Sequence, residues 1–130
     1  MNEIETVKRY LYNVLTTELD IPVYSDIQKD VKDDTYCVFF VLDGSPVKYV
    51  SNITAWTEFD VRINIWSKEF KYILLGYIIN VLDGVQGITI ENGSDKGYIQ
   101  SIQYTRQSTL KDPDFPDWFG VQAQFTIRVK

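Results

Sequence analysis

Few residues in this chain have the chemistry that catalysis needs. None of its 130 residues is a histidine, so the side chain used most often as a general base or metal ligand is absent. Cys37 is the single cysteine and lies in the apolar run Tyr36–Leu42, which favours a buried small hydrophobic residue over a nucleophile. Glycine-rich phosphate loops, Gly-x-Ser-x-Gly elbows and paired-cysteine metal motifs do not occur. These residues predict a protein that is not an enzyme and needs no cofactor.

Two clusters of aspartates are the remaining candidates for chemistry. They are Asp30, Asp33 and Asp34 in one polar stretch, and Asp112, Asp114 and Asp117 in another. Closely spaced carboxylates can bind Ca²⁺, but the EF-hand spacing with its glycine and terminal glutamate is missing. We therefore expect solvated loops and no metal. A small hydrolase with an acidic site stays as an alternative, because any two of the 18 acidic residues could meet in a pocket.

Composition and charge narrow the class of protein further. The net charge of −5 and the pI near 4.6 argue against a general nucleic-acid binder, although an acidic channel would let nucleic acid slide past without sticking. The length predicts one domain over residues 1–130. A lone cysteine suits a reducing compartment. The N-terminal residues do not resemble a signal peptide, and no apolar run approaches the length of a membrane span, so we expect synthesis in a cytoplasm and no membrane association.

The clearest structural pattern runs from Ile53 to Trp66. Apolar residues occupy one parity, namely Ile53, Ala55, Phe59, Val61, Ile63 and Ile65. Polar residues dominate the other parity, namely Asn52, Thr54, Glu58, Asp60, Arg62 and Asn64. Because successive strand residues point to opposite faces, this pattern predicts a long strand with one apolar and one wet face. The polar face would meet solvent or a neighbouring subunit.

The other elements follow from periodicity and turn residues. Apolar spacing predicts helices from about residue 4 to 19 and from 68 to 82, the second with Ser67 as N-cap and with Gly76 packed closely against the sheet. Asp43-Gly44-Ser45-Pro46 predicts a turn, and Asn92-Gly93 a hairpin whose loop is lengthened to Gly97. Strands are predicted at 23–24, 36–42, 53–66, 88–91, 98–106 and 121–129, with a polar loop at 25–34 and a bulge or loop at 51–52.

These elements predict an α+β fold in the order α-β-β-β-α-β-β-β. Each helix shows a single apolar stripe, and a mainly antiparallel sheet of about five to six strands, with both helices on one face, would bury both stripes. The run Tyr36–Leu42 would be a central strand covered on both faces. A stand-alone ligand-binding domain of this class stays open as an alternative, and it would show an apolar cavity.

Large aromatic residues stand out on surfaces that should otherwise be polar. Trp56 and Trp66 share the polar face of the long strand, where either a strand or loop of the same chain covers them or they anchor an interface. The same two alternatives apply to the late loop, 111–120, whose aromatic residues either pack under their own domain or dock on a neighbour. The candidate interface residues are Trp56, Glu58, Asp60, Arg62, Trp66, Asp114, Phe115, Trp118 and Phe119.

Four short stretches resemble one family across nearly the whole chain. They are Ile21-Pro22-Val23-Tyr24-Ser25 after the first helix, the strand run Tyr36–Val41, the strand end Val61–Ser67 before the second helix, and the closing run Trp118–Ile127. In these stretches the chain resembles the tail-completion or tail-terminator proteins of long-tailed bacteriophages.

The resemblance implies a structural virion protein of the tail that acts by assembly. It implies a homo-oligomeric ring, a hexamer in many members, that caps the tail tube protein and presents a surface to the head-connector or stopper protein. DNA would pass through the lumen without specific binding. A head–tail joining protein of the neck with a similar fold is the alternative within the virion. Closed rings need heterologous contacts, and the polar strand face and late loop are the surfaces expected to make them.

Overall fold

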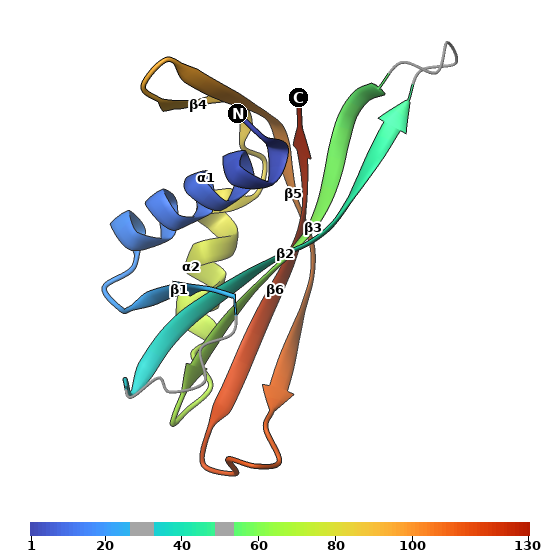
Figure 1. Cartoon of the computed structure of the whole chain (residues 1–130). Helices are drawn as coiled ribbons and strands as arrows, with labels where there is room; N and C mark the ends of the chain where they lie inside the picture. The colour runs from blue at the N-terminus through green and yellow to red at the C-terminus, as the bar shows by residue number, and fades with distance from the viewer. Residues whose placement is uncertain (27–32, 49–53) are drawn as a thin grey trace.

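The computed structural model describes residues 1–26, 33–48 and 54–130 (Figure 1). Within these residues, two helices and six strands follow the predicted order: α1 (Glu3–Glu18), β1 (Val23–Ser25), β2 (Thr35–Lys48), β3 (Thr54–Ser67), α2 (Tyr72–Leu82), β4 (Gln86–Asn92), β5 (Asp95–Lys111) and β6 (Phe119–Val129). The predicted feature at 51–52 and most of the predicted loop at 25–34 lie outside the described residues. Ile53 and Asp30 do so as well.

The strands form one mixed sheet in the order β1-β2-β3-β6-β5-β4. β1 pairs with β2 in parallel, whereas the other pairings are antiparallel. The prediction of a mainly antiparallel sheet is corrected on this point, because the direction of a three-residue strand is set by the path of the chain after α1 and leaves no residue pattern. The prediction that Tyr36–Leu42 is a central strand buried on both faces holds only for Cys37–Phe39, and the rest of that run is partly exposed. β1 flanks β2 beside these three residues alone, so the remainder of the run lies at an edge of the sheet.

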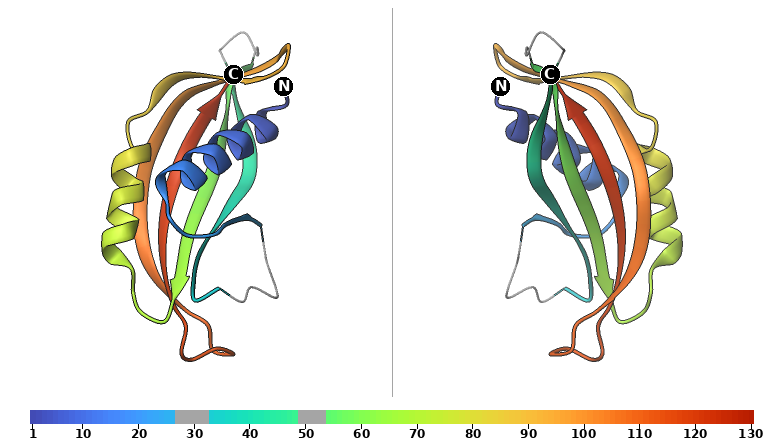
Figure 2. Two further views of the ribbon diagram at one scale, coloured as in Figure 1. Left: turned by 90° about the vertical axis from the view of Figure 1, so that its left-hand side faces the viewer. Right: turned by 90° about the vertical axis from the view of Figure 1, so that its right-hand side faces the viewer.

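Both helices lie against the same face of the sheet, and no helix of the described residues lies on the opposite face (Figure 2). α1 contributes Val7, Leu11 and Leu15 to the core, and α2 contributes Leu75, Ile78 and Leu82. They meet the odd-numbered residues of β3 and β6, such as Ile63 and Phe125, which are almost fully buried. Burying each such side chain contributes about 1.5–3 kcal/mol, so this one-sided core is what joins the helices to the sheet.

The two helices begin differently. The side chain of Asn2 accepts a hydrogen bond from the amide of Ile4 at 2.9 Å and caps α1. α2 begins only at Tyr72, and the predicted N-cap at Ser67 is wrong. The Ser67 hydroxyl is instead hydrogen-bonded to the Thr35 hydroxyl across the β2–β3 ladder, 3.0 Å away. This cross-strand contact holds Ser67 in β3 and delays the helix start.

The expected turn at 43–46 is an irregular stretch of β2. The strand continues to Lys48 and pairs with β3 throughout, with a register shift between Leu42 and Gly44. A Cβ atom at Gly44 would lie 2.7 Å from the Phe59 ring, so the glycine lets that buried ring pack against the backbone. The bulge absorbs the turn-forming residues, and β2 and β3 together project past the rest of the sheet as a long arm (Figure 1).

The second half of the chain also differs from its expected boundaries. Asn92 pairs with Asp95, so the hairpin has a two-residue loop rather than one lengthened to Gly97. β5 then runs 17 residues, well beyond the predicted strand. The predicted close packing of Gly76 against the sheet is wrong, because a Cβ atom on it would meet no heavy atom of the described residues within 4 Å.

Candidate functional site

The predicted interface residues of β3 lie on the bare face of the sheet. Asp60 pairs with Leu42 and Thr126, and Arg62 pairs with Phe40 and Gln124. Their odd-numbered neighbours are in the core, so alternation places the even-numbered ones opposite the helices. Trp56, Glu58 and Trp66 share this parity. The structure therefore gathers five of the nine predicted residues on one surface, which we call the bare face.

A chain of polar side chains crosses the middle of the bare face. The Gln122 amide donates to Asn64 Oδ1 at 2.8 Å, the Gln124 amide donates to Gln122 Oε1 at 3.0 Å, and Arg106 Nε donates to Gln124 Oε1 at 3.0 Å. Asn64, Gln122 and Gln124 are only 7%, 7% and 8% exposed although no helix covers them. This amide ladder links β3, β6 and β5, and its members satisfy one another.

Charged pairs lie beside the amide ladder. Arg128 Nε donates to Glu58 Oε1 at 2.7 Å, and the Arg128 guanidinium sits 5.1 Å from the centre of the Trp56 ring. Arg62 lies 3.6 Å from Asp60. These pairs are partly exposed, so each contributes little to stability. Their planar guanidinium groups are nevertheless well suited to contacts with another protein.

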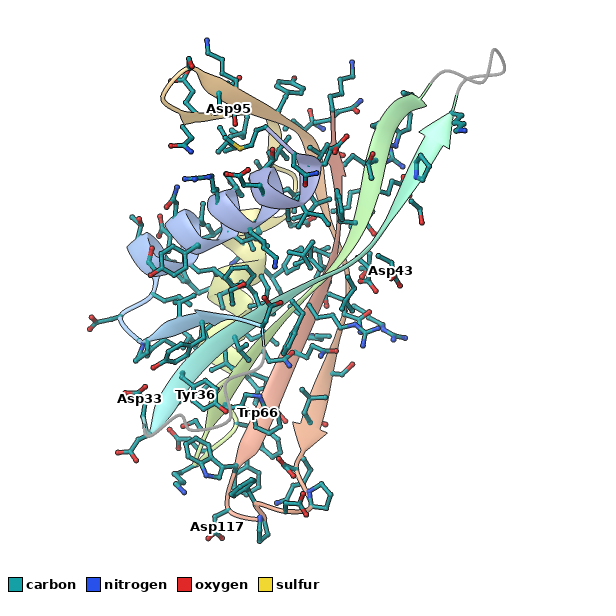
Figure 3. The ribbon with its side chains drawn as sticks, viewed as in Figure 1. Asp33, Tyr36, Asp43, Trp66, Asp95 and Asp117 are labelled. Carbon is teal, nitrogen blue, oxygen red and sulfur yellow. The ribbon has the colours of Figure 1, made fainter. Side chains whose placement is uncertain are left out.

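Aromatic residues gather at the end of the sheet near the late loop. Trp66 covers Gly120, where an added Cβ atom would lie 2.9 Å from the indole ring. Tyr36 makes an edge contact with Trp118, with ring centres 5.8 Å apart, and Lys68 lies over the Trp118 ring. Figure 3 shows Tyr36 and Trp66 at the same end of the molecule as the loop that carries Asp117.

The late loop, predicted at 111–120, spans residues 112–118 in the structure, and Phe119 begins β6. Its predicted interface residues divide between the two interpretations. Trp118 and Phe119 are half-buried against their own domain, and Phe119 packs against Phe70. Phe115 is 57% exposed, and Asp114 is exposed while its amide donates to the Asp112 carboxylate at 2.9 Å. Trp118 and Phe119 are therefore partly covered by their own domain, whereas Phe115 projects from a loop held by its own hydrogen bonds.

The described residues gather few groups that could perform catalysis. They contain no cluster of three or more histidine, cysteine, aspartate or glutamate side chains able to hold a metal. Burial raises the pKa of the Cys37 thiol to about 12, so the thiol stays protonated at neutral pH and is a poor nucleophile. No helix in the described part of the chain is long and apolar enough to cross a membrane.

Sequence reasoning missed two features of this surface. Alternation places Asn64, Gln122 and Gln124 on the polar face, but only the register of β3 against β6 brings Asn64 opposite Gln122. The second missed feature lies at the edge of the sheet, where β5 continues from the predicted end at Arg106 to Lys111. A run rich in threonine and glutamine with no glycine or proline was the available signal.

Comparison with known proteins supports a shared fold. No protein-family model and no curated protein matches the chain. Among solved structures, the chain is similar to one from the virion of a native gene transfer agent particle, with a TM-score of 0.64 and 14% identity. The match covers 96% of this chain and 92% of that chain. At this identity the likeness establishes a common fold over nearly the whole length of both chains.

Proposed function

We propose that this chain is a structural virion protein whose subunits form a ring, cap the tail tube and join it to the head connector, without catalysis. The observation that carries the proposal is the fold likeness to a virion chain over 96% of the residues. The sequence stretches that resemble tail-terminator proteins support the same assignment. The likeness takes in nearly the whole fold and not one segment of it.

The bare face and the late loop supply the contact surfaces in this proposal. The bare face presents half-buried Trp56 and Trp66 with Glu58, Asp60 and Arg62 between them. Tryptophan and arginine are the residues most enriched at the energetic centres of interfaces. Within the described part of the chain, the buried Nε atom of Arg62 meets no acceptor. The Nε atom itself is covered by its own chain, but the Arg62 side chain is 40% exposed, so its outer N–H groups can meet a carboxylate or carbonyl of an adjoining subunit.

Assembly of the purified protein tests the proposal. Light scattering across a concentration series and negative-stain imaging, with and without tail tubes of the same virus, should show rings free in solution or at the tube ends. A subunit that remains monomeric at every concentration and forms no ring on tubes would contradict the proposal. Rings that bind the portal side of the neck but never a tube end would instead identify a head–tail joining protein.

A charge reversal then locates the interface. Arg62→Glu should reduce ring yield at least about tenfold, because like charges placed in an interface cost several kcal/mol. Lys96→Glu is the matched control, since it makes the same change of charge on an exposed residue of the β4–β5 hairpin. If both variants assemble equally well, the bare face is not the contact surface.

A further inference from the structure

The two edges of the sheet are protected to very different degrees. Beyond Phe39, the edge of β2 carries a bulge after Leu42, a positive φ of 27° at Asp43, and Pro46, which has no amide proton. Bulges and prolines are the devices by which natural sheets prevent another strand from pairing with an exposed edge. The edge of β2 is thus closed to further pairing.

The edge of β5 has few such devices beyond Tyr104. In the described part of the chain, no strand pairs with it on the side away from β6 between Thr105 and Lys111. This stretch contains neither proline nor glycine. A bulge lies at its beginning, between Tyr104 and Arg106, and regular pairing with β6 resumes after it. A long, regular edge of this kind is a template for an additional strand.

The hydrogen bonds of β5 identify which backbone groups point outward. The amide of Ile102 donates to Val85 O at 2.9 Å, and the amide of Tyr104 donates to Asp83 Oδ1 at 3.0 Å, so both residues face away from β6. Outward and inward pairs alternate along an antiparallel ladder, and the bulge shifts the alternation by one residue. The outward residues of the free edge are therefore Gln107, Thr109 and Lys111.

An open groove runs beside this edge. It has a volume of about 270 Å³ and is lined by Tyr72 and Leu75 from α2 and by Gln107, Ser108 and Thr109 from β5. Gly76 lies one turn after Tyr72 on the same side of the helix. A glycine inside a helix costs about 1 kcal/mol relative to alanine, and packing does not require one here. What the glycine provides is open space beside the groove.

The charges along the free edge differ from those of the protein as a whole. Between Lys96 and Lys111 the chain has no acidic residue, although its net charge is −5. Arg106, on the bare-face side, is exposed, as is Lys111 at the strand end. Gln107 and Thr109 pair with core residues Ala123 and Val121, so their side chains point toward the helix side. An added strand would place alternate residues in the groove and the intervening ones beside Arg106.

We propose that the free edge of β5 binds an extended peptide of another protein, apolar at alternate positions and acidic between them, as a seventh strand. The backbone of Gln107 and Thr109 exchanges hydrogen bonds with the peptide, apolar side chains contact Tyr72 and Leu75, and acidic side chains meet Arg106. Such strand addition takes its affinity from the main chain and its specificity from alternate side chains. The site uses the sheet edge rather than the bare face, so it goes beyond the proposed ring and does not depend on it.

A designed peptide tests this site on the full chain. The probe is the blocked peptide acetyl-Thr-Val-Glu-Val-Glu-Val-Thr-amide, followed by NMR titration and amide hydrogen exchange. Saturable binding should slow exchange of the Gln107 and Thr109 amides at least about tenfold, since strand pairing protects these protons. The peptide with lysine in place of glutamate should bind at least about tenfold more weakly.

Two variants locate the peptide. Thr109→Pro removes one outward amide, a change that edge strands tolerate, and should abolish binding while circular dichroism stays unchanged. Gly76→Leu places a large side chain in the open space one turn from Tyr72 and should also abolish binding, which provides a second test if the proline variant fails to fold. Ile73→Leu is the control on the same helix, because Ile73 is 93% exposed and does not line the groove; it should bind normally.

Three outcomes would overturn the proposal. One is the absence of saturable binding by either peptide at millimolar concentration. Another is undiminished binding by Gly76→Leu or by a folded Thr109→Pro. The third is protection of the Gln107 and Thr109 amides that rises with protein concentration alone, which would show that a second copy of this chain occupies the edge.

Discussion

Removing the centre of the amide ladder should destabilise the protein much more than removing an exposed glutamine. Gln122→Ala eliminates two hydrogen bonds and leaves Asn64 Oδ1 and Gln124 Nε2 without partners at positions only 7–8% exposed. Each lost bond costs about 0.5–1.5 kcal/mol and each stranded group about 1–3 kcal/mol before relaxation. We expect the free energy of unfolding to fall by about 2–4 kcal/mol in total.

Urea denaturation followed by far-ultraviolet circular dichroism measures this loss. Gln103→Ala is the matched control, because Gln103 is exposed on the adjoining strand, and it should change stability by less than about 0.5 kcal/mol. A double-mutant cycle between Asn64→Ala and Gln122→Ala should give a coupling energy of about 1 kcal/mol, as contacting residues do. If Gln122→Ala behaves like Gln103→Ala, or the coupling is zero, the ladder is not a stabilising network.

Four further predictions concern single positions. Burial raises the pKa of the Cys37 thiol from 9.0 to about 12, so the unfolded state loses this proton at a lower pH than the folded state. Stability should therefore fall as pH rises above 9, by up to about 1.4 kcal/mol per pH unit from this group. Cys37→Ala should reduce that slope in urea titrations. Gly97→Ala should lower the melting temperature, since the added Cβ would clash with Thr6, whereas Gly76→Ala should raise stability by about 1 kcal/mol. Trp118→Ala should impair assembly more than folding. The yield of rings imaged at tube ends should fall under conditions where the melting temperature shows that the variant is still folded.

The elements with strict alternation were the most predictable. β3 and β6 alternate cleanly, and both were located almost to the residue because a single face of each is buried. The apolar stripes located both ends of α1 and the end of α2 to within one residue, but not the start of α2. The bounds of β2 and β5 were not predicted, because Gly44 and Pro46 suggested a turn and the predicted strand ended at Arg106, before the polar residues that continue β5. In both cases pairing with a long neighbouring strand overrides local preference.

The candidate surface was predictable in outline only. Parity alone placed Glu58, Asp60 and Arg62 on one face. The single apolar stripe of each helix also predicted that both helices pack on the other face, and the structure confirms this placement. The partnership of Asn64 with Gln122 required the register of β3 against β6, which two separate strand patterns do not specify.

The chemistry of the bare face fits a surface that is exposed to solvent in a free subunit and covered in an assembly. A broad apolar face on a free subunit would drive nonspecific association, and a densely charged face would resist losing its water on assembly. The amide ladder avoids both costs, because Asn64, Gln122 and Gln124 satisfy one another whether or not a partner is present. The remaining capacity for specific contacts lies with the flanking arginine and tryptophan side chains, such as Arg62 and Trp56. Burial of the bare face in an assembly would therefore cost little in desolvation at its centre and gain its specificity at the margins.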